Sequence, residues 1–133
     1  MSFGCGDIIA ISELAARVIT GYIDAPEDYG HISNDVKALG DMIDDAKEHF
    51  EGTYLSDKRR ETGQVVLKGC ESVLADLNDL VEKYKSLDSN KKLDWNRIKF
   101  VKEDITPLRQ RLITNTGFLT NFLGESVIPL TPV

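Results

Sequence analysis

The stretch "YGHISNDVKALGDMIDDAKEHF", residues 29–50, decides the fold class of this chain. Its apolar positions recur at alternating spacings of three and four residues: Tyr29, Ile32, Val36, Leu39, Ile43, Ala46 and Phe50. Such spacing is typical of an amphipathic helix whose apolar stripe packs against other helices. Between these positions lie Asp41, Asp44, Asp45 and Glu48. For these four carboxylates we favour a solvated helix face over a cation site.

Two later segments repeat the same pattern. One is predicted to begin after an N-cap at Ser56 and to run to Tyr84, with apolar positions Leu67, Cys70, Val73, Leu74, Leu77, Leu80, Val81 and Tyr84. The other carries Trp95, Ile98, Val101, Ile105, Leu108, Leu112, Leu119, Phe122 and Leu123. Pro107 interrupts it, because proline removes a backbone hydrogen bond and clashes with the preceding turn. We expect a short helix near 94–104, a kink or break, and a helix from 107 to about 123.

The first segment, residues 7–24, is apolar around most of its circumference. Only Glu13, Arg17, Thr20 and Asp24 form a narrow polar stripe. A helix of this kind is normally buried on several sides. Asp7 is predicted to be its N-cap.

These segments predict an all-α fold. Four amphipathic helices, with "SLDSNKK" (86–92) as a loop and no run that alternates with period two, indicate an antiparallel bundle of four to five helices. We expect one domain over residues 1–124. Residues 125–133 contain two prolines and no helical period, so we expect the start of a linker to a further C-terminal region.

Bulk composition narrows the function classes. The 133 residues carry a net charge of −6, spread unevenly: residues 1–82 hold 7 Lys/Arg against 17 Asp/Glu, whereas residues 83–133 hold 9 against 5. We favour complementary faces packing within the bundle over a basic surface for anionic lipid or a partner. Nucleic-acid binding is not expected, since no aromatic-basic pattern accompanies the positive half. Two cysteines, Cys5 and Cys70, make no disulfide framework, and they indicate a reducing cytoplasm.

The apolar first segment is neither a signal peptide nor a simple membrane span. No Lys or Arg precedes the run, and no small-residue cleavage site closes it. Glu13 and Arg17 interrupt it, and it falls short of the roughly 20 apolar residues that a bilayer requires.

No catalytic constellation is visible in the sequence. P-loop, HExxH, CxxC, GxSxG and EF-hand patterns do not occur, so we expect no enzyme, cofactor or metal site. Structural or surface roles are favoured for both histidines, His31 and His49. His49 falls near the end of its helix, where an imidazolium would suit the helix dipole.

Four quoted elements carry a family resemblance: "MSFGCGDIIAISELAARV", "DAPEDYGHISNDVKAL", "LKGCESVLADLNDLVEKYKSL" and "DWNRIKFVKEDITPLRQRLITNTGFLTNFL". In this order they resemble the HeLo-like N-terminal domains of fungal STAND (NLR-like) proteins, over residues 1 to about 124. The resemblance implies a helical bundle that is held inactive until a C-terminal module receives a signal. It then oligomerises and targets the membrane through its N-terminal helix, in programmed cell death such as heterokaryon incompatibility. The matching membrane-active residues are Phe3, Ile8, Ile9, Ile11, Leu14, Val18 and Ile19.

Three hypotheses remain open from the sequence. The leading one is a non-enzymatic cytoplasmic signalling domain that self-associates and relocates to the plasma membrane on activation, under control of a C-terminal sensor module. The second is an interaction or dimerisation bundle with no membrane role. The third is a small enzyme or ligand-binding bundle. It would need a pocket with convergent polar groups, and nothing in the sequence indicates one.

Overall fold

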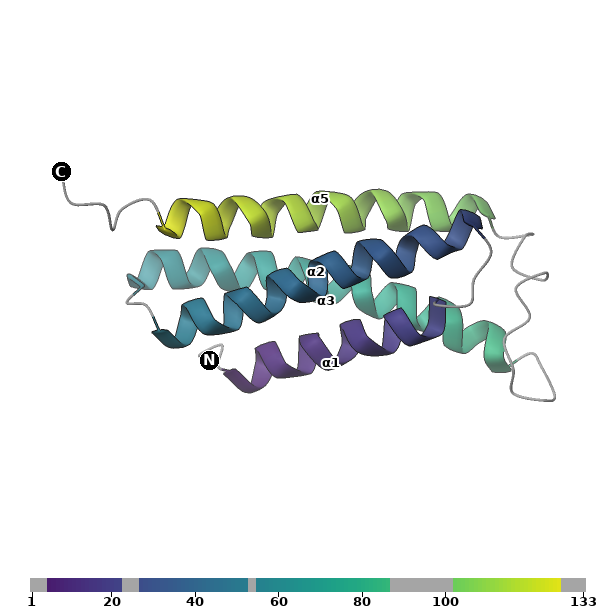
Figure 1. Ribbon diagram of the computed structural model, residues 1–133, viewed down its shortest axis with the longest axis horizontal. Helices are drawn as coiled ribbons and strands as arrows, with labels where there is room; N and C mark the ends of the chain where they lie inside the picture. The colour runs from purple at the N-terminus through teal and green to yellow at the C-terminus, as the bar shows by residue number, and fades with distance from the viewer. Residues whose placement is uncertain (1–4, 23–26, 53–54, 87–101, 128–133) are drawn as a thin grey trace.

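A computed structural model describes residues 5–22, 27–52, 55–86 and 102–127, and Figure 1 shows their arrangement. These residues form four helices: α1 (Cys5–Tyr22), α2 (Glu27–Gly52), α3 (Asp57–Ser86) and α5 (Lys102–Val127). Successive helices run in opposite directions along one long axis, and the described ranges contain no strand. The predicted all-α antiparallel bundle is confirmed.

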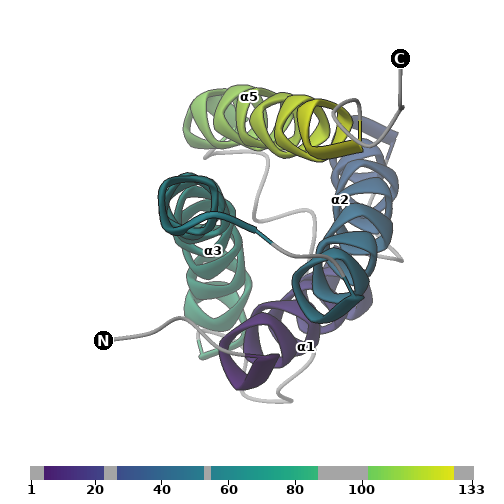
Figure 2. The same ribbon diagram turned by 90° about the vertical axis from the view of Figure 1, so that its left-hand side faces the viewer.

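The four helices stand at the corners of a square. Helix α1 packs against α2 and α3, and α5 packs against the same two helices from the other side. Figure 2, which looks along the bundle, places α1 and α5 at opposite corners. The N-terminal helix is therefore a corner of the bundle and has two neighbours rather than three.

The core is built by the apolar seams that the spacing predicted. The seams of α2 and α3 are buried, with Leu80 only partly buried and the side chains of Tyr29 and Tyr84 outside the described set. Buried core residues come from every helix and from Leu55, just before α3: Ile8, Ile11, Ala15, Val18, Tyr22, Ile32, Val36, Leu39, Ile43, Ala46, Phe50, Leu55, Leu67, Cys70, Val73, Leu74, Leu77, Val81, Ile105, Leu112, Leu119 and Phe122. Since one cluster includes them all, the helices share a single core.

Helix α1 differs from its prediction in two ways. It begins at Cys5, so Asp7 lies inside the first turn rather than at the N-cap, where its charge still complements the helix dipole. It is also buried along one face instead of on several sides, because it occupies a corner: Ala10 and Ala16 are exposed. The polar residues Glu13 and Arg17 face solvent, as the sequence indicated.

Helix α3 begins where the sequence predicted. The Oγ of Ser56 accepts a hydrogen bond from the backbone N–H of Arg59 at 3.2 Å, the geometry of an N-cap. Farther along, Gly69 lies so close to the Asn115 side chain that a Cβ there would collide with Oδ1. The absence of a side chain at Gly69 therefore lets α3 and α5 approach closely.

Helix α5 runs through Pro107, so of the predicted kink or break, the break does not occur. The proline ring is exposed and lies in the second turn of the helix, so it costs one backbone bond, to the carbonyl of Glu103, near an end that frays in any case. The other seam residues of α5 pack into the core as predicted, with Leu108 and Leu123 partly buried. Trp95 and most of the predicted helix 94–104 lie outside the described residues.

Candidate functional site

The candidate membrane-active residues fall into three groups on α1. Ile8, Ile11 and Val18 are buried against the bundle, and Leu14 and Ile19 pack at the edge of the core. Ile9 points outward, with 42% of its surface exposed. Phe3 lies outside the described residues. Most of the apolar surface predicted to meet lipid is thus covered by α2 and α3 in this structure.

Polar contacts and close packing hold α1 in place. The buried Tyr22 hydroxyl donates to the Leu77 carbonyl on α3 at 3.1 Å. The Ser12 hydroxyl donates to Asp44 Oδ1 on α2, also at 3.1 Å, on the surface. Val81 lies 3.1 Å from where a Cβ of Gly21 would stand, so the end of α1 sits tightly on α3. The C-terminal end of α1 is therefore anchored in the core, whereas the Ser12 contact lies on the surface.

The outward surface of α1 mixes charged and apolar side chains. Glu13 and Arg17 lie on it beside Ala10 and Ala16, and shallow hollows on either side separate it from α2 and α3. Across the described residues, no helix combines the length and hydropathy that a bilayer crossing requires.

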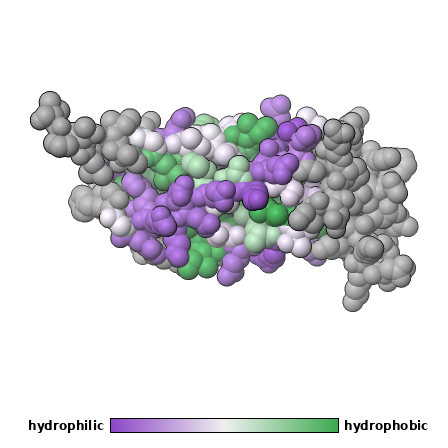
Figure 3. Space-filling view, viewed as in Figure 1, coloured by the Kyte–Doolittle hydropathy of each residue, from purple (hydrophilic) through white to green (hydrophobic). Residues whose placement is uncertain are grey.

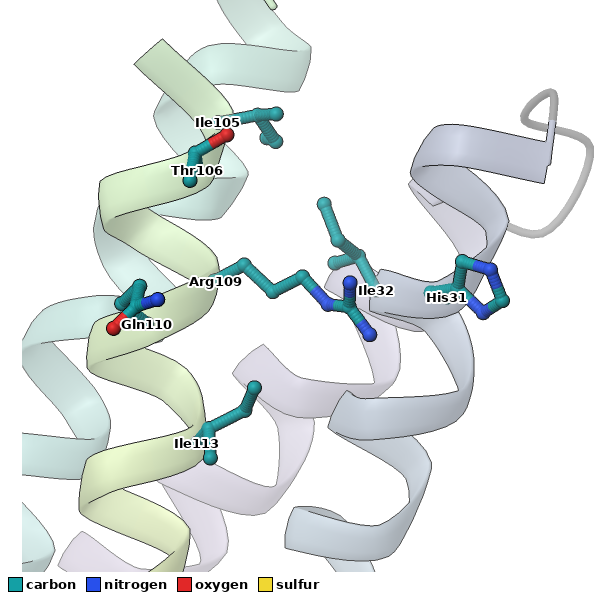
Figure 4. A pocket seen from close by; sticks show the side chains of 7 residues that line it. All are labelled: His31, Ile32, Ile105, Thr106, Arg109, Gln110 and Ile113. Carbon is teal, nitrogen blue, oxygen red and sulfur yellow. The ribbon is translucent and has the colours of Figure 1, made fainter. Parts of the chain in front are cut away.

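A pocket of about 380 Å³ lies between α2 and α5, lined by His31, Ile32, Ile105, Thr106, Arg109, Gln110 and Ile113. Figure 4 shows Arg109 extended from α5 towards Ile32 on α2. Its Nε donates to Asp35 Oδ2 at 3.1 Å. The Asp35 carboxylate offsets the charge of Arg109, which disfavours an anion in this pocket.

The acidic run on α2 forms the solvated face that was predicted. Asp41, Asp44, Asp45 and Glu48 are all exposed, and Asp44 accepts the hydrogen bond from Ser12. Among the described residues, no three His, Cys, Asp or Glu side chains gather in a way that could hold a metal ion.

An aromatic and arginine cluster closes the end of the bundle where α2 and α5 finish and α3 begins. Phe50 and Phe122 stack with ring centroids 6.1 Å apart. The Arg59 guanidinium lies 4.6 Å from the centroid of the Phe122 ring and donates to the Phe122 carbonyl at 3.2 Å, and Arg60 lies 5.4 Å from that of Phe50. Sequence reasoning placed both phenylalanines on seams but missed the arginines, because cation–π contacts join residues far apart in the chain.

His49 belongs to the same cluster, and its environment disfavours the imidazolium that the helix dipole alone would suit. Burial and the nearby Arg59 charge lower the pKa of His49 from its ordinary value of 6.5. Its Nε2 atom is buried and has no hydrogen-bond partner among the described residues. Desolvation and a neighbouring cation therefore outweigh any favourable helix-dipole effect here.

Exposed apolar side chains on α5 are a second feature that sequence reasoning missed. Ile113 and Phe118 expose 55% and 54% of their surface. Val65 on α3 is also exposed, at 67%. A signal was present: the sequence from 112 to 124, "LITNTGFLTNFLG", contains no charged residue.

Comparison of the chain with family models, curated proteins and solved structures found no match.

Proposed function

We propose that this chain is a HeLo-like signalling domain that self-associates and acts on membranes through α1. The observation that supports the proposal is the surface of α1, whose inner face is apolar and whose outer face is partly apolar. The helix has an apolar inner face that the bundle covers and an outer face with Ile9, Ala10 and Ala16 exposed. If α1 leaves, α2 and α3 each keep their contacts with α5.

Release of α1 requires a compensating environment. Its buried Ile8, Ile11 and Val18 each lose about 1.5–3 kcal/mol of burial when they meet water. Lipid or the α1 helices of sister copies would restore that burial. Glu13 and Arg17 oppose deep insertion, at about 2.5–3.5 kcal/mol each for a bilayer centre on insertion scales. The proposal therefore requires an oligomer that shields these two residues or a helix that lies in the interface.

Dye leakage from vesicles that contain anionic lipid tests the membrane step. Ile9→Glu changes the exposed side of α1 and should leave the bundle folded while reducing leakage. Val65→Glu is the matched control, because Val65 is an exposed aliphatic residue on another helix. Absence of leakage by the unaltered chain, or equal effects of the two variants, contradicts the membrane role.

A reversible tether tests whether α1 must move. The Ser12 and Asp44 side chains meet on the surface, so Ser12→Cys with Asp44→Cys can join α1 to α2, in a Cys5→Ser background. The oxidised protein should not release dye, and reduction of the bridge should restore leakage in the same sample. Equal leakage in both redox states would show that α1 acts without leaving the bundle.

The second candidate function is an interaction or dimerisation bundle with no membrane role. The exposed Ile113 and Phe118 on α5 favour it, since they lie on the corner opposite α1. A chain that dimerises yet leaves vesicles intact would favour this function over the first.

A further inference from the structure

One helix face is unlike the rest of the described surface. On α5 the outward residues are Gln110, Ile113, Thr114, Gly117, Phe118 and Asn121, all exposed and none charged. We name these six residues the outer α5 face. In a chain in which 29% of residues are charged, a charge-free exposed face with two large apolar side chains indicates a contact surface.

Ion pairs engage Arg109 and Arg111, the two charged residues that border the outer α5 face among the described side chains of α5. Arg109 pairs with Asp35 of α2 along one border. Arg111 pairs with Asp76 of α3 along the other, Nη1 to Oδ2 at 2.7 Å, and also donates to the Ser72 hydroxyl. In Figure 3 the upper edge, where α5 lies in Figure 1, carries green, pale and purple atoms together, while a broad purple area lies below it.

Gly117 is a second, independent observation. Glycine in the middle of a helix is unfavourable compared with alanine, so its presence calls for a close approach. Gly21, Gly40, Gly63 and Gly69 each have a neighbour within 4.0 Å of the place where a Cβ would stand, and Gly52 and Gly124, which have open space there, lie in the last turns of α2 and α5. Gly117 has open space as well, but it lies in the middle of α5. Packing within the chain therefore gives no reason for a glycine here. An approaching backbone from outside would give one.

We propose that the outer α5 face is a homodimer interface, on which α5 of a second copy of this chain packs against Gly117. The lack of charge on the outer α5 face allows a second copy to meet it in spite of the net charge of each copy. The net charge is −6, and contact through α2 would set Asp41, Asp45 and Glu48 against the same acidic surface of the other copy. A two-fold interface sets each face against itself, so a face without charges avoids both repulsion and ion desolvation.

The outer α5 face also has the side chains that such an interface needs. Ile113 and Phe118 flank Gly117 and can pack beside the partner's helix. Gln110, Thr114 and Asn121 have donors and acceptors that can pair with their counterparts in the other copy. The interface locates the self-association of the proposed function on α5, and in that respect rests on it. It does not require the membrane step of α1.

Sedimentation equilibrium of the full chain tests the interface. The unaltered chain should form dimers at micromolar concentration. Phe118→Asp and Gly117→Leu should each weaken dimerisation at least tenfold while circular dichroism stays unchanged, since one adds a charge to the face and the other blocks close approach. Val65→Asp, an equally exposed apolar site on α3, should dimerise as the unaltered chain does.

Three results would overturn the proposal: a chain that is monomeric at every concentration tested, an equal loss of dimer in Val65→Asp, or full dimerisation of Gly117→Leu. Vesicle leakage of the same variants separates this interface from the membrane role. Loss of leakage in Ile9→Glu with an intact dimer concerns α1 alone, and loss of the dimer in Phe118→Asp concerns α5 alone.

Discussion

Two glycines show how one residue type serves different ends in the same bundle. Gly63 is buried beneath the aromatic cluster, where a Cβ would stand 2.5 Å from Phe50 Cζ and 2.8 Å from Phe122 Cζ. Gly117 faces open space on α5. The two rings at Gly63 stack on each other and lie under Arg59 and Arg60, so they have little freedom to move aside.

Gly63→Ala should therefore destabilise the chain although alanine is the better helix former. Overpacking costs about 1–3 kcal/mol and exceeds the roughly 1 kcal/mol that helix propensity returns. Urea unfolding of dilute protein measures the difference. Gly117→Ala is the matched control and should raise the free energy of unfolding by about 0.5–1 kcal/mol. A gain of stability in both variants would mean that the phenylalanine rings move at little cost.

His49 should make stability depend on pH. Its pKa is lowered in the folded chain by burial and by Arg59, so the unfolded chain binds its proton more readily. The stability that the neutral imidazole contributes is fully present above the ordinary pKa of 6.5 and is lost as pH falls through that value towards the folded pKa. Urea midpoints between about pH 8 and pH 5.5 measure the loss.

His49→Gln is the control for this pH effect. Glutamine does not titrate, so the difference between the two proteins should shrink or change sign as pH falls. His31 is exposed and present in both, and it cancels in the comparison. Parallel pH profiles for the two proteins would show that His49 titrates alike in the folded and unfolded states.

At the scale of the element, helix α5 tolerates the backbone hydrogen bond that is missing at Pro107. Pro107→Ala should restore the backbone bond to the Glu103 carbonyl and remove the ring clash, and it should raise the free energy of unfolding by about 1–3 kcal/mol. Proline also lowers the conformational entropy of the unfolded chain, and its replacement loses this stabilising effect, so the net gain is smaller. Urea unfolding again provides the measurement. A loss of stability would instead mean that the fixed backbone angle of Pro107 helps to start α5.

The elements themselves follow closely from local spacing. Ile32, Val36 and Leu39 are buried because a repeat of three and four residues can place them on one stripe only when the chain is helical. The prediction at Pro107 was a kink or a break, and the break does not occur. The sequence could not decide between the two because it does not reveal how close a proline lies to the end of its helix. Likewise, the N-cap prediction succeeded at Ser56 and failed at Asp7, which lies two residues inside a helix that begins at Cys5.

At the scale of the whole molecule, the charge distribution predicts how salt affects self-association. Each copy carries a net charge of −6, so two copies repel at long range while the proposed α5 contact contains no ion pairs. Raising ionic strength from about 0.02 M to about 0.5 M should therefore strengthen dimerisation, because screening acts on the repulsion alone. Sedimentation at the two salt concentrations measures this effect. Weaker association in high salt would point to an interface that depends on charge pairs.

The candidate surfaces were harder to predict than the fold. Periodicity marks which side of a helix is apolar but not which corner of the bundle the helix occupies, so α1 was expected to be buried on several sides and is buried on one. Ile113 and Phe118 lie outside the apolar seam of α5, so the spacing of apolar residues gave no reason to single them out. Arg59 above Phe122 depends on tertiary packing of helices that are distant in sequence.

The buried thiol of Cys70 can report on opening of the core. The thiol is buried on the seam between α3 and α5, its Sγ lies 3.7 Å from the Asn115 carbonyl oxygen, and burial raises its pKa to about 12. A thiol reagent can modify Cys70 only when that seam opens, so the rate of modification measures how often α3 separates from α5. Departure of α1 alone should leave the rate of Cys70 modification almost unchanged, whereas global unfolding should raise it. The rate of Cys70 modification thus distinguishes a local departure of α1, as the proposed function requires, from unfolding of the whole core.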